Sequence, residues 1–215
     1  MNDDSLAKLP VAGVLAEAVA ASRGGAIVVT APPGSGKTML VPAAVLDDLP
    51  AGQQVVLLQP RRLAARAVAR RIAQLRGGRV GEEVGYHVRF DACVGRDTRL
   101  VVATTGILLR RLLDDVALDG IGAVVLDEFH ERTIEMDLVL GLAVRIRQTL
   151  RPDLRIVVMS ATLDAAPIAD FLGADVMQIP GRTFPVDVEF NAKADTRPVP
   201  LRVAGVEVPV QAERP

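Results

Sequence analysis

The stretch that decides the fold runs from Ala26 to Thr38 and reads AIVVTAPPGSGKT. Its first five residues are mostly β-branched, as in a buried strand, and the rest form a turn rich in glycine and proline. The end of the turn matches the motif G-x-x-x-x-G-K-[ST], although Ala31 replaces the first glycine. We expect Gly34 and Gly36 to curl the backbone so that successive N–H groups face one point, at which the next helix aims its positive end. The stretch therefore predicts a phosphate-binding loop.

The side chains that end this turn suit a nucleotide bound with magnesium. Lys37 is expected to reach the β- and γ-phosphates, and the Thr38 hydroxyl to hold Mg²⁺. The other loop residues expected at the nucleotide are Pro33, Gly34, Ser35 and Gly36. An ordinary glycine-rich turn is the alternative, but a strand directly before it and a helix directly after it favour phosphate binding. ATP and Mg²⁺ are the predicted cofactors.

A second apolar strand, about ninety residues later, ends in two carboxylates. We expect Asp127 to hold Mg²⁺, directly or through water, and Glu128 to orient and polarise the attacking water. His130 follows closely and is a further catalytic candidate, as a relay between the nucleotide and neighbouring elements, although a lone histidine is often structural. Ser160 and Thr162 place two hydroxyls at another strand end, which is a weak signal by itself.

Short apolar strands alternate with helices along the chain. Strands are expected at 26–30, 54–59, 100–103, 124–126 and 155–159, with an extended segment at 80–90. Helices are expected at 6–21, 36–48, 61–76, 105–113, 137–150 and 164–171. This alternation predicts an α/β fold with a mostly parallel sheet and helices on both faces. We expect one domain over residues 1–188 and a Pro-rich tail without a recognisable domain over 189–215.

Composition limits the class of protein further. The 215 residues carry a net charge of −1, which argues against the wholly basic surface of a small nucleic-acid-binding module. The single Cys93 excludes an intrachain disulfide and a multi-cysteine metal site. The acidic N-terminus leads into no signal peptide, and no apolar run approaches the ~20 residues that span a bilayer. The expected location is the cytoplasm, without a membrane partner.

Three motifs in the order GSGKT, DEFHER and SAT resemble the DEAH-box branch of the superfamily 2 ATP-dependent helicases. The segments QPRRLAA (59–65), GYHVRF (85–90) and GILLR (106–110) sharpen the resemblance. The motif DEFH, in place of DEAH, is most similar to that of the bacterial HrpB-like helicases. The resemblance covers residues 6–188 and implies the fold of a RecA-like P-loop NTPase, as the first lobe of a helicase.

The resemblance also implies roles for arginines in the third expected helix. The positions of Arg61 and Arg62 belong to a motif that contacts the nucleic-acid backbone, and that of Arg71 stacks its guanidinium on the adenine. An exposed Arg-rich helix face is the plain alternative for this stretch. The motif position favours phosphate contact for Arg61 and Arg62, whereas Arg66 and Arg70 stay undecided.

Two further motifs gain a role from the resemblance. The segment of Thr104, Thr105 and Gly106 is implied to touch the nucleic-acid strand, although Thr105 stands where the family usually has an acidic residue. Ser160 and Thr162 are implied to couple the nucleotide site to strand movement. The expected nucleic-acid partner is a single strand or duplex, with RNA favoured over DNA.

Such helicases close a second RecA-like lobe over the ATP, and arginines from that lobe can contribute ~10³–10⁵ in rate. The residues after Pro185 match none of its motifs, so we expect this chain to lack it, to hydrolyse ATP slowly alone and to unwind no duplex. A non-catalytic nucleotide- or partner-binding remnant is the alternative. A transporter ATPase is less favoured because no transporter signature lies between the loop and Asp127, and a small GTPase because the guanine-reading motif N-K-x-D is absent.

Overall fold

The computed structural model describes residues 9–161 and 165–179. The strands are β1 (Ala26–Thr30), β2 (Gln54–Gln59), β3 (Val84–Val88), β4 (Asp91–Cys93), β5 (Leu100–Thr104), β6 (Ile121–Leu126), β7 (Arg155–Ser160) and β8 (Asp175–Gln178). The α-helices are α1 (Leu15–Ser22), α2 (Lys37–Asp48), α3 (Arg62–Leu75), α4 (Thr105–Asp114), α5 (Ile134–Thr149) and α6 (Ala166–Leu172). The described residues also form the 3₁₀ turns η2 (Pro10–Val14) and η3 (Phe129–Glu131).

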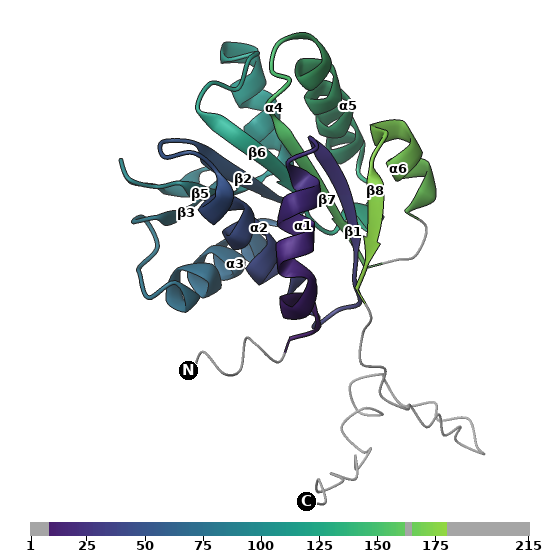
Figure 1. The fold of residues 1–215 in the computed structure, drawn as a ribbon. Coiled ribbons are helices and arrows are strands. Elements are labelled where there is room, and N and C mark those ends of the chain that lie inside the picture. Colours follow the sequence, from purple (N-terminus) through teal and green to yellow (C-terminus); the bar gives the residue numbers. More distant parts are fainter. Residues whose placement is uncertain (1–8, 162–164, 180–215) are drawn as a thin grey trace, which may run out of the picture. The chain divides into compact units, whose positions relative to one another are not determined.

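The eight strands form one sheet in the order β4-β3-β5-β2-β6-β7-β1-β8 (Figure 1). Every pairing is parallel except that of β3 with β4. The central strand β6 is buried along its whole length, as parallel strands covered on both faces require. The predicted α/β fold with a mostly parallel sheet is confirmed.

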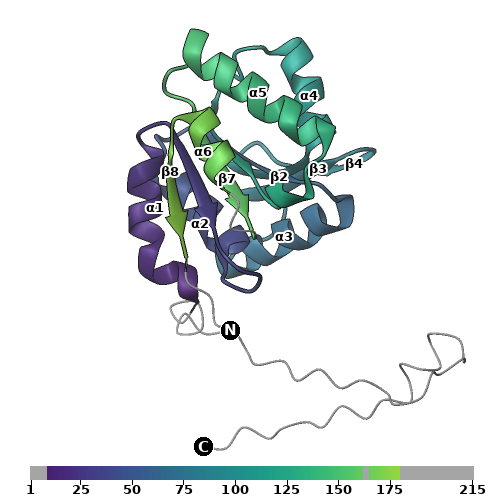
Figure 2. The ribbon, with the colours of Figure 1, turned by 90° about the vertical axis from the view of Figure 1, so that its right-hand side faces the viewer.

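Helices cover both faces of the sheet (Figures 1 and 2). On one face α1, α2 and α3 bury residues such as Val45 and Ile72 against the strands. On the other face α4, α5 and α6 bury residues such as Leu108 and Val139. These two aliphatic layers hold the fold together, at ~25 cal/mol per Å² of apolar surface removed from water. No helix within the described ranges is both long and apolar enough to cross a membrane.

The carboxyl ends of the parallel strands meet at one edge of the sheet. Thr30 pairs in register with Ser160, and Gln59 pairs with Thr104. The residue after β6, Asp127, donates its backbone N–H to the carbonyl of Leu58 at 3.1 Å. In open α/β sheets this edge is where ligands bind. The fold thus brings the predicted phosphate loop, the carboxylates and Ser160 into one region.

The N-terminal helix expected at 6–21 is shorter than predicted. Residues 10–14 form the 3₁₀ turn η2, and the α-helix begins only at Leu15. Pro10 donates no N–H to an i→i−4 ladder, and Gly13 is a poor helix former, so a tight turn replaces the first helical turns. The part of the expected helix that precedes residue 9 lies outside the described part of the chain.

Two strands were not predicted, β4 and β8. Both are short, with three and four residues, and exposed or half-buried throughout, so neither carries a buried apolar signal. The extended segment expected at 80–90 narrows to β3, with an isolated bridge at Val80. The proposed boundary at residue 188 and the tail after it lie outside the described residues.

Asp48 fastens α1 and α2 to β7. Its carboxylate accepts hydrogen bonds from Arg23 and from Arg155, the latter at 2.6 Å. The two guanidiniums hold the pKa of Asp48 well below its usual range. The carboxylate is therefore ionised at neutral pH and stabilises the fold there, in a role unrelated to the nucleotide.

Candidate nucleotide-binding site

The predicted phosphate loop lies between β1 and α2. Gly34 and Gly36 have φ values of 78° and 90°, the left-handed region that L side chains rarely adopt. The left-handed Gly36 is the N-cap of α2, which begins at Lys37. The two glycines thus adopt the conformations that a curled loop requires, and Ala31, in place of the first motif glycine, is buried without a positive φ.

Lys37 is the residue of the loop whose side chain best suits an anion. It is only 4% exposed. Among the residues that the structure describes, the Lys37 ammonium has neither an ion pair nor a hydrogen bond. An ammonium without a protein partner in the first turn of a helix fits the phosphate that the sequence predicts.

Asp127 joins the loop to the end of β6. Its carboxylate is fully buried, and Oδ2 accepts hydrogen bonds of 2.6 Å from the Thr38 hydroxyl and from the Gln59 side-chain amide. Carboxylate and hydroxyl oxygens are ligands that Mg²⁺ accepts, with the remaining positions filled by phosphate and water. The two predicted metal ligands therefore lie in direct contact.

Glu128 leaves the strand in an unusual conformation, with φ 52° and ψ 36°. A non-glycine residue in this region carries a strain of about 1–3 kcal/mol, which is common at functional sites. The Glu128 N–H donates to Asp127 Oδ1 at 2.9 Å, so the neighbouring carboxylate stabilises this turn. The turn separates the two carboxylates, with Asp127 buried and Glu128 half-exposed at the cleft.

His130 connects the carboxylates to the end of β7. Its Nδ1 accepts a hydrogen bond from the Ala161 N–H at 3.3 Å and lies 3.5 Å from Glu128 Oε2. One nitrogen cannot accept from Ala161 and donate to Glu128 together, so the contact with Glu128 is the weaker of the two. His130 thus contacts the Ser-Ala-Thr segment, in which the Ser160 carbonyl accepts from the Ala31 N–H at 3.0 Å, and its predicted role as a relay between the nucleotide and neighbouring elements stays a prediction. Thr162 lies outside the described residues.

A cleft of about 340 Å³ lies beside Thr38, Asp127 and Glu128. Its lining consists of Thr38, Met39, Gln59, Pro60, Arg61, Ala64, Val68, Asp127, Glu128 and Glu131. Arg71 follows Ala64 and Val68 at helical spacing on α3, so it belongs to the side of the helix that borders the cleft. Its predicted contact with the adenine stays a prediction.

The residues predicted to contact nucleic acid lie next to the cleft. Arg61 is exposed and forms an ion pair of 3.1 Å with Glu131, and Arg62 donates to the Arg89 carbonyl at 3.4 Å. Gly106 is exposed, with open space where a side chain would be.

The other members of that predicted contact are less accessible. Thr104 is half-buried at the end of β5, and Thr105 is only 8% exposed. Exposed surface in this segment therefore comes from Gly106 rather than from the Thr105 side chain. The predicted contacts of all three residues with a strand stay predictions.

The arginines left undecided on α3 have separate environments. Arg66 forms an ion pair with Asp91 and lies over the Tyr86 ring, so it fastens α3 to the β3–β4 hairpin. Arg70 is exposed. Arg66 is therefore a structural residue.

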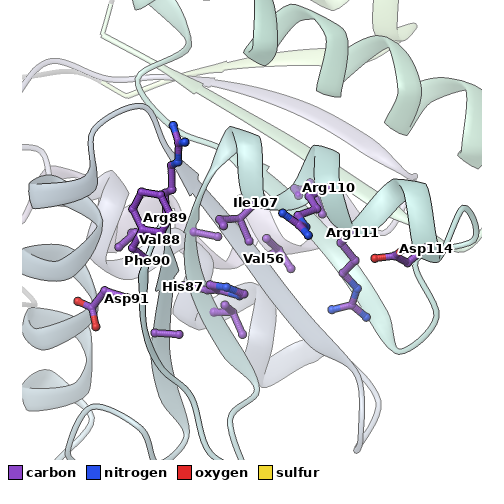
Figure 3. A pocket seen from close by; sticks show the side chains of 14 residues that line it. Val56, His87, Val88, Arg89, Phe90, Asp91, Ile107, Arg110, Arg111 and Asp114 are labelled. Carbon is purple, nitrogen blue, oxygen red and sulfur yellow. The ribbon is translucent and has the colours of Figure 1, made fainter.

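A second groove, of about 850 Å³, lies beside α4 and the β3–β4 hairpin (Figure 3). It shares no lining residue with the cleft. At the hairpin Arg89 lies over the ring of Phe90, which is 87% exposed. Phe90 also has a positive φ of 68°. Because Arg62 bonds to the Arg89 backbone, these two residues adjoin the predicted nucleic-acid contact.

Two residues of the site escaped sequence reasoning, Gln59 and Glu131. Gln59 ends β2 and binds Asp127, which is 68 residues away. Its place at the end of an apolar run and at the start of the segment QPRRLAA is the signal that could have found it. Glu131 gains its role from the ion pair with Arg61, which no local pattern predicts.

Fold and site together define a P-loop nucleotide-binding domain of the RecA-like kind. The sequence matches the DEAD/DEAH box helicase family over residues 14–171, and the chain belongs to that family of ATP-dependent enzymes.

Relatives within the family agree with this assignment. The chain is 44% identical to the ATP-dependent RNA helicase HrpB of Escherichia coli (strain K12), over 85% of this chain and 23% of the relative. It is 43% identical to the putative ATP-dependent RNA helicase DHX57 of Homo sapiens, over 80% of this chain and 13% of the relative. The crystal structure of the Escherichia coli DEAH/RHA helicase HrpB matches with a TM-score of 0.79 and 44% identity, covering 84% of this chain and 23% of that one. The chain thus spans less than a quarter of these relatives.

Proposed function

We propose that the chain is the ATP-binding lobe of an ATP-dependent RNA helicase. It binds Mg·ATP in the cleft at the carboxyl edge of the sheet and one strand of nucleic acid beside it. The observation that carries the proposal is the placement of Lys37, which directly precedes the bonded pair of Thr38 and Asp127 and whose ammonium has no partner among the described residues.

Each residue of the proposed site has a separate role in hydrolysis. Lys37 and the loop amides hold the β- and γ-phosphates, while Thr38 and Asp127 hold the metal ion. Mg²⁺, when bound, supplies charge neutralisation on the phosphate oxygens. Glu128 orients the attacking water and accepts its proton. His130 couples nucleotide binding at the site to the Ser-Ala-Thr motif.

RNA is favoured as the nucleic acid because the relatives HrpB, DHX57 and DExH3 of Arabidopsis thaliana are all named ATP-dependent RNA helicases. The proposed strand contacts are Arg61, Arg62 and the segment around Gly106. Arg89 and Phe90 extend this surface, because an exposed guanidinium suits a phosphate and an exposed ring suits an unstacked base.

The proposed lobe works together with a second RecA-like lobe. A single lobe leaves the phosphates open to water on one side, so we expect slow hydrolysis and no duplex unwinding by this chain alone. Robust strand separation by the isolated chain would show that the partner lobe is unnecessary.

Calorimetric titration with ADP tests the proposal. Folded wild-type protein is expected to take up Mg·ADP, and excess EDTA is expected to weaken the affinity by about tenfold or more, because the metal shares the charge of the phosphates with Asp127 and Thr38. Circular dichroism confirms that the protein stays folded in EDTA. No heat of binding from folded protein with Mg²⁺ present contradicts the proposal.

Glu131 is expected to limit RNA binding, because its carboxylate occupies Arg61. Glu131→Gln frees the guanidinium and removes a negative charge near the phosphates, so the affinity for a single-stranded oligouridylate should rise by roughly two- to fivefold at low salt. The gain should shrink as salt increases, since exposed charges are screened.

Fluorescence anisotropy with labelled oligouridylate measures this effect. Glu135→Gln, an equivalent change at an exposed residue in the first turn of α5, is the matched control. Wild-type affinity in Glu131→Gln would mean that Arg61 does not contact the strand.

A further inference from the structure

We propose that residues Leu9, Pro10 and Val11 form a brace that positions the phosphate loop from its outer side and raises its affinity for nucleotide phosphates. The affinity effect rests on the proposed function. The brace itself is a contact between two segments of the folded chain and can be measured without a nucleotide.

The first contact of the brace is a backbone hydrogen bond. The Val11 N–H donates to the Ser35 carbonyl at 3.2 Å. Val11 is fully buried, and Ser35 is 1% exposed. In a loop whose N–H groups turn towards an anion, carbonyls turn outwards, and a buried carbonyl needs a donor. Val11 supplies that donor from 24 residues away in the sequence.

The second contact is the packing of the Leu9 and Val11 side chains against the backbone of Gly36. A Cβ atom at Gly36 would lie 2.7 Å from Leu9 Cδ1 and 3.2 Å from Val11 Cγ1. The side chains of Leu9 and Val11 therefore occupy the space that a side chain at position 36 would need. Gly34, the other left-handed glycine of the loop, has open space at the same position. The brace acts on the glycine that directly precedes Lys37.

These contacts restrain the backbone of Gly36, which as a glycine could otherwise adopt many conformations. Glycine has more accessible backbone conformations than any other residue, so an unrestrained Gly36 would have to be ordered when the phosphates bind. With Gly36 held at φ 90° by packing from outside, its neighbours keep the conformation that opens α2 towards the phosphates. Leu9 and Val11 are thus positioning residues that touch neither nucleotide nor metal.

Leu9→Ala tests the brace, with Leu15→Ala as the matched control. Both leucines are half-buried, and Leu15 packs against the core from the first turn of α1. Leu9→Ala is expected to raise the calorimetric dissociation constant for Mg·ADP about tenfold. Leu15→Ala should lower the melting temperature but leave that constant within about twofold of the wild type. Leu9→Val is the milder variant if Leu9→Ala fails to fold.

Amide hydrogen exchange without nucleotide provides the second readout. The reporters are the Val11 amide, which donates to Ser35, and the Met39 and Leu40 amides, which donate to the Gly36 carbonyl. Their exchange should be faster in Leu9→Ala and unchanged in Leu15→Ala.

Two results would overturn the brace. One is wild-type exchange at these amides in Leu9→Ala, and the other is an affinity loss in both variants that simply follows their loss of stability. If the wild-type protein binds no nucleotide, the proposed function fails, while the exchange measurement still decides whether the brace restrains the loop.

Discussion

Lys37→Ala is expected to raise the dissociation constant for Mg·ADP by roughly a hundredfold. Hydrogen bonds to charged groups contribute about 1.5–3 kcal/mol each, and 3 kcal/mol corresponds to a factor of about 150. Lys37 is the cationic residue of the phosphate loop, so its loss removes the loop's charged donor to the phosphates. Calorimetry measures the loss directly.

The same substitution has a second, opposite signature in the nucleotide-free protein. Because the ammonium has no partner among the described residues, removing its charge breaks no interaction within them. Lys37→Met keeps most of the aliphatic stem and is the control for the cavity that Ala leaves. Lys37→Met should therefore melt at the wild-type temperature or above it, and added Mg·ADP should no longer raise that temperature. A lower melting temperature together with normal nucleotide stabilisation would contradict the assigned role.

Glu128→Gln is expected to lower the rate of ATP hydrolysis by about 10²–10⁴ while leaving ATP affinity within about threefold of the wild type. The amide retains the size of the side chain and the strained backbone but cannot accept the proton of the attacking water. Because the lobe alone should be slow, the rate is best measured in single turnovers with protein in excess over ATP.

This measurement also separates an enzyme from a remnant that only binds nucleotide. Glu135→Gln, exposed at the start of α5, is the matched control and should hydrolyse ATP as the wild type does. Equal rates for Glu128→Gln and the wild type would leave Glu128 without a role as base and would favour the non-catalytic alternative.

Much of the site could be predicted because its signals are local. The phosphate loop is a continuous run of residues between an apolar strand and a helix, and the structure places Gly34 and Gly36 in the left-handed region that the motif requires. Asp127 follows a strand that is buried on both faces. Parallel strands share their carboxyl edge, so the convergence of Thr38 and Asp127 followed from the predicted fold class.

The interactions that the sequence did not reveal join residues far apart in the chain. Gln59 reaches Asp127 through the pairing of β2 with β6, and His130 reaches Ala161 across the ends of β6 and β7. Arg66 was left undecided from the sequence, and only its contact with Asp91 shows that it is structural. The strands β4 and β8 were missed because their residues lack the buried apolar pattern of the central strands.

The sequence alone determined that this is a P-loop α/β domain with the motifs of a DEAH-type helicase lobe, because glycine placement and apolar strands act over a few residues. Only the tertiary structure decided that Lys37 is buried without a partner in the described chain, that Glu131 occupies Arg61, and that Leu9 packs behind Gly36. Burial and pairing depend on which distant segments the sheet and its helices bring together, and no local pattern records that.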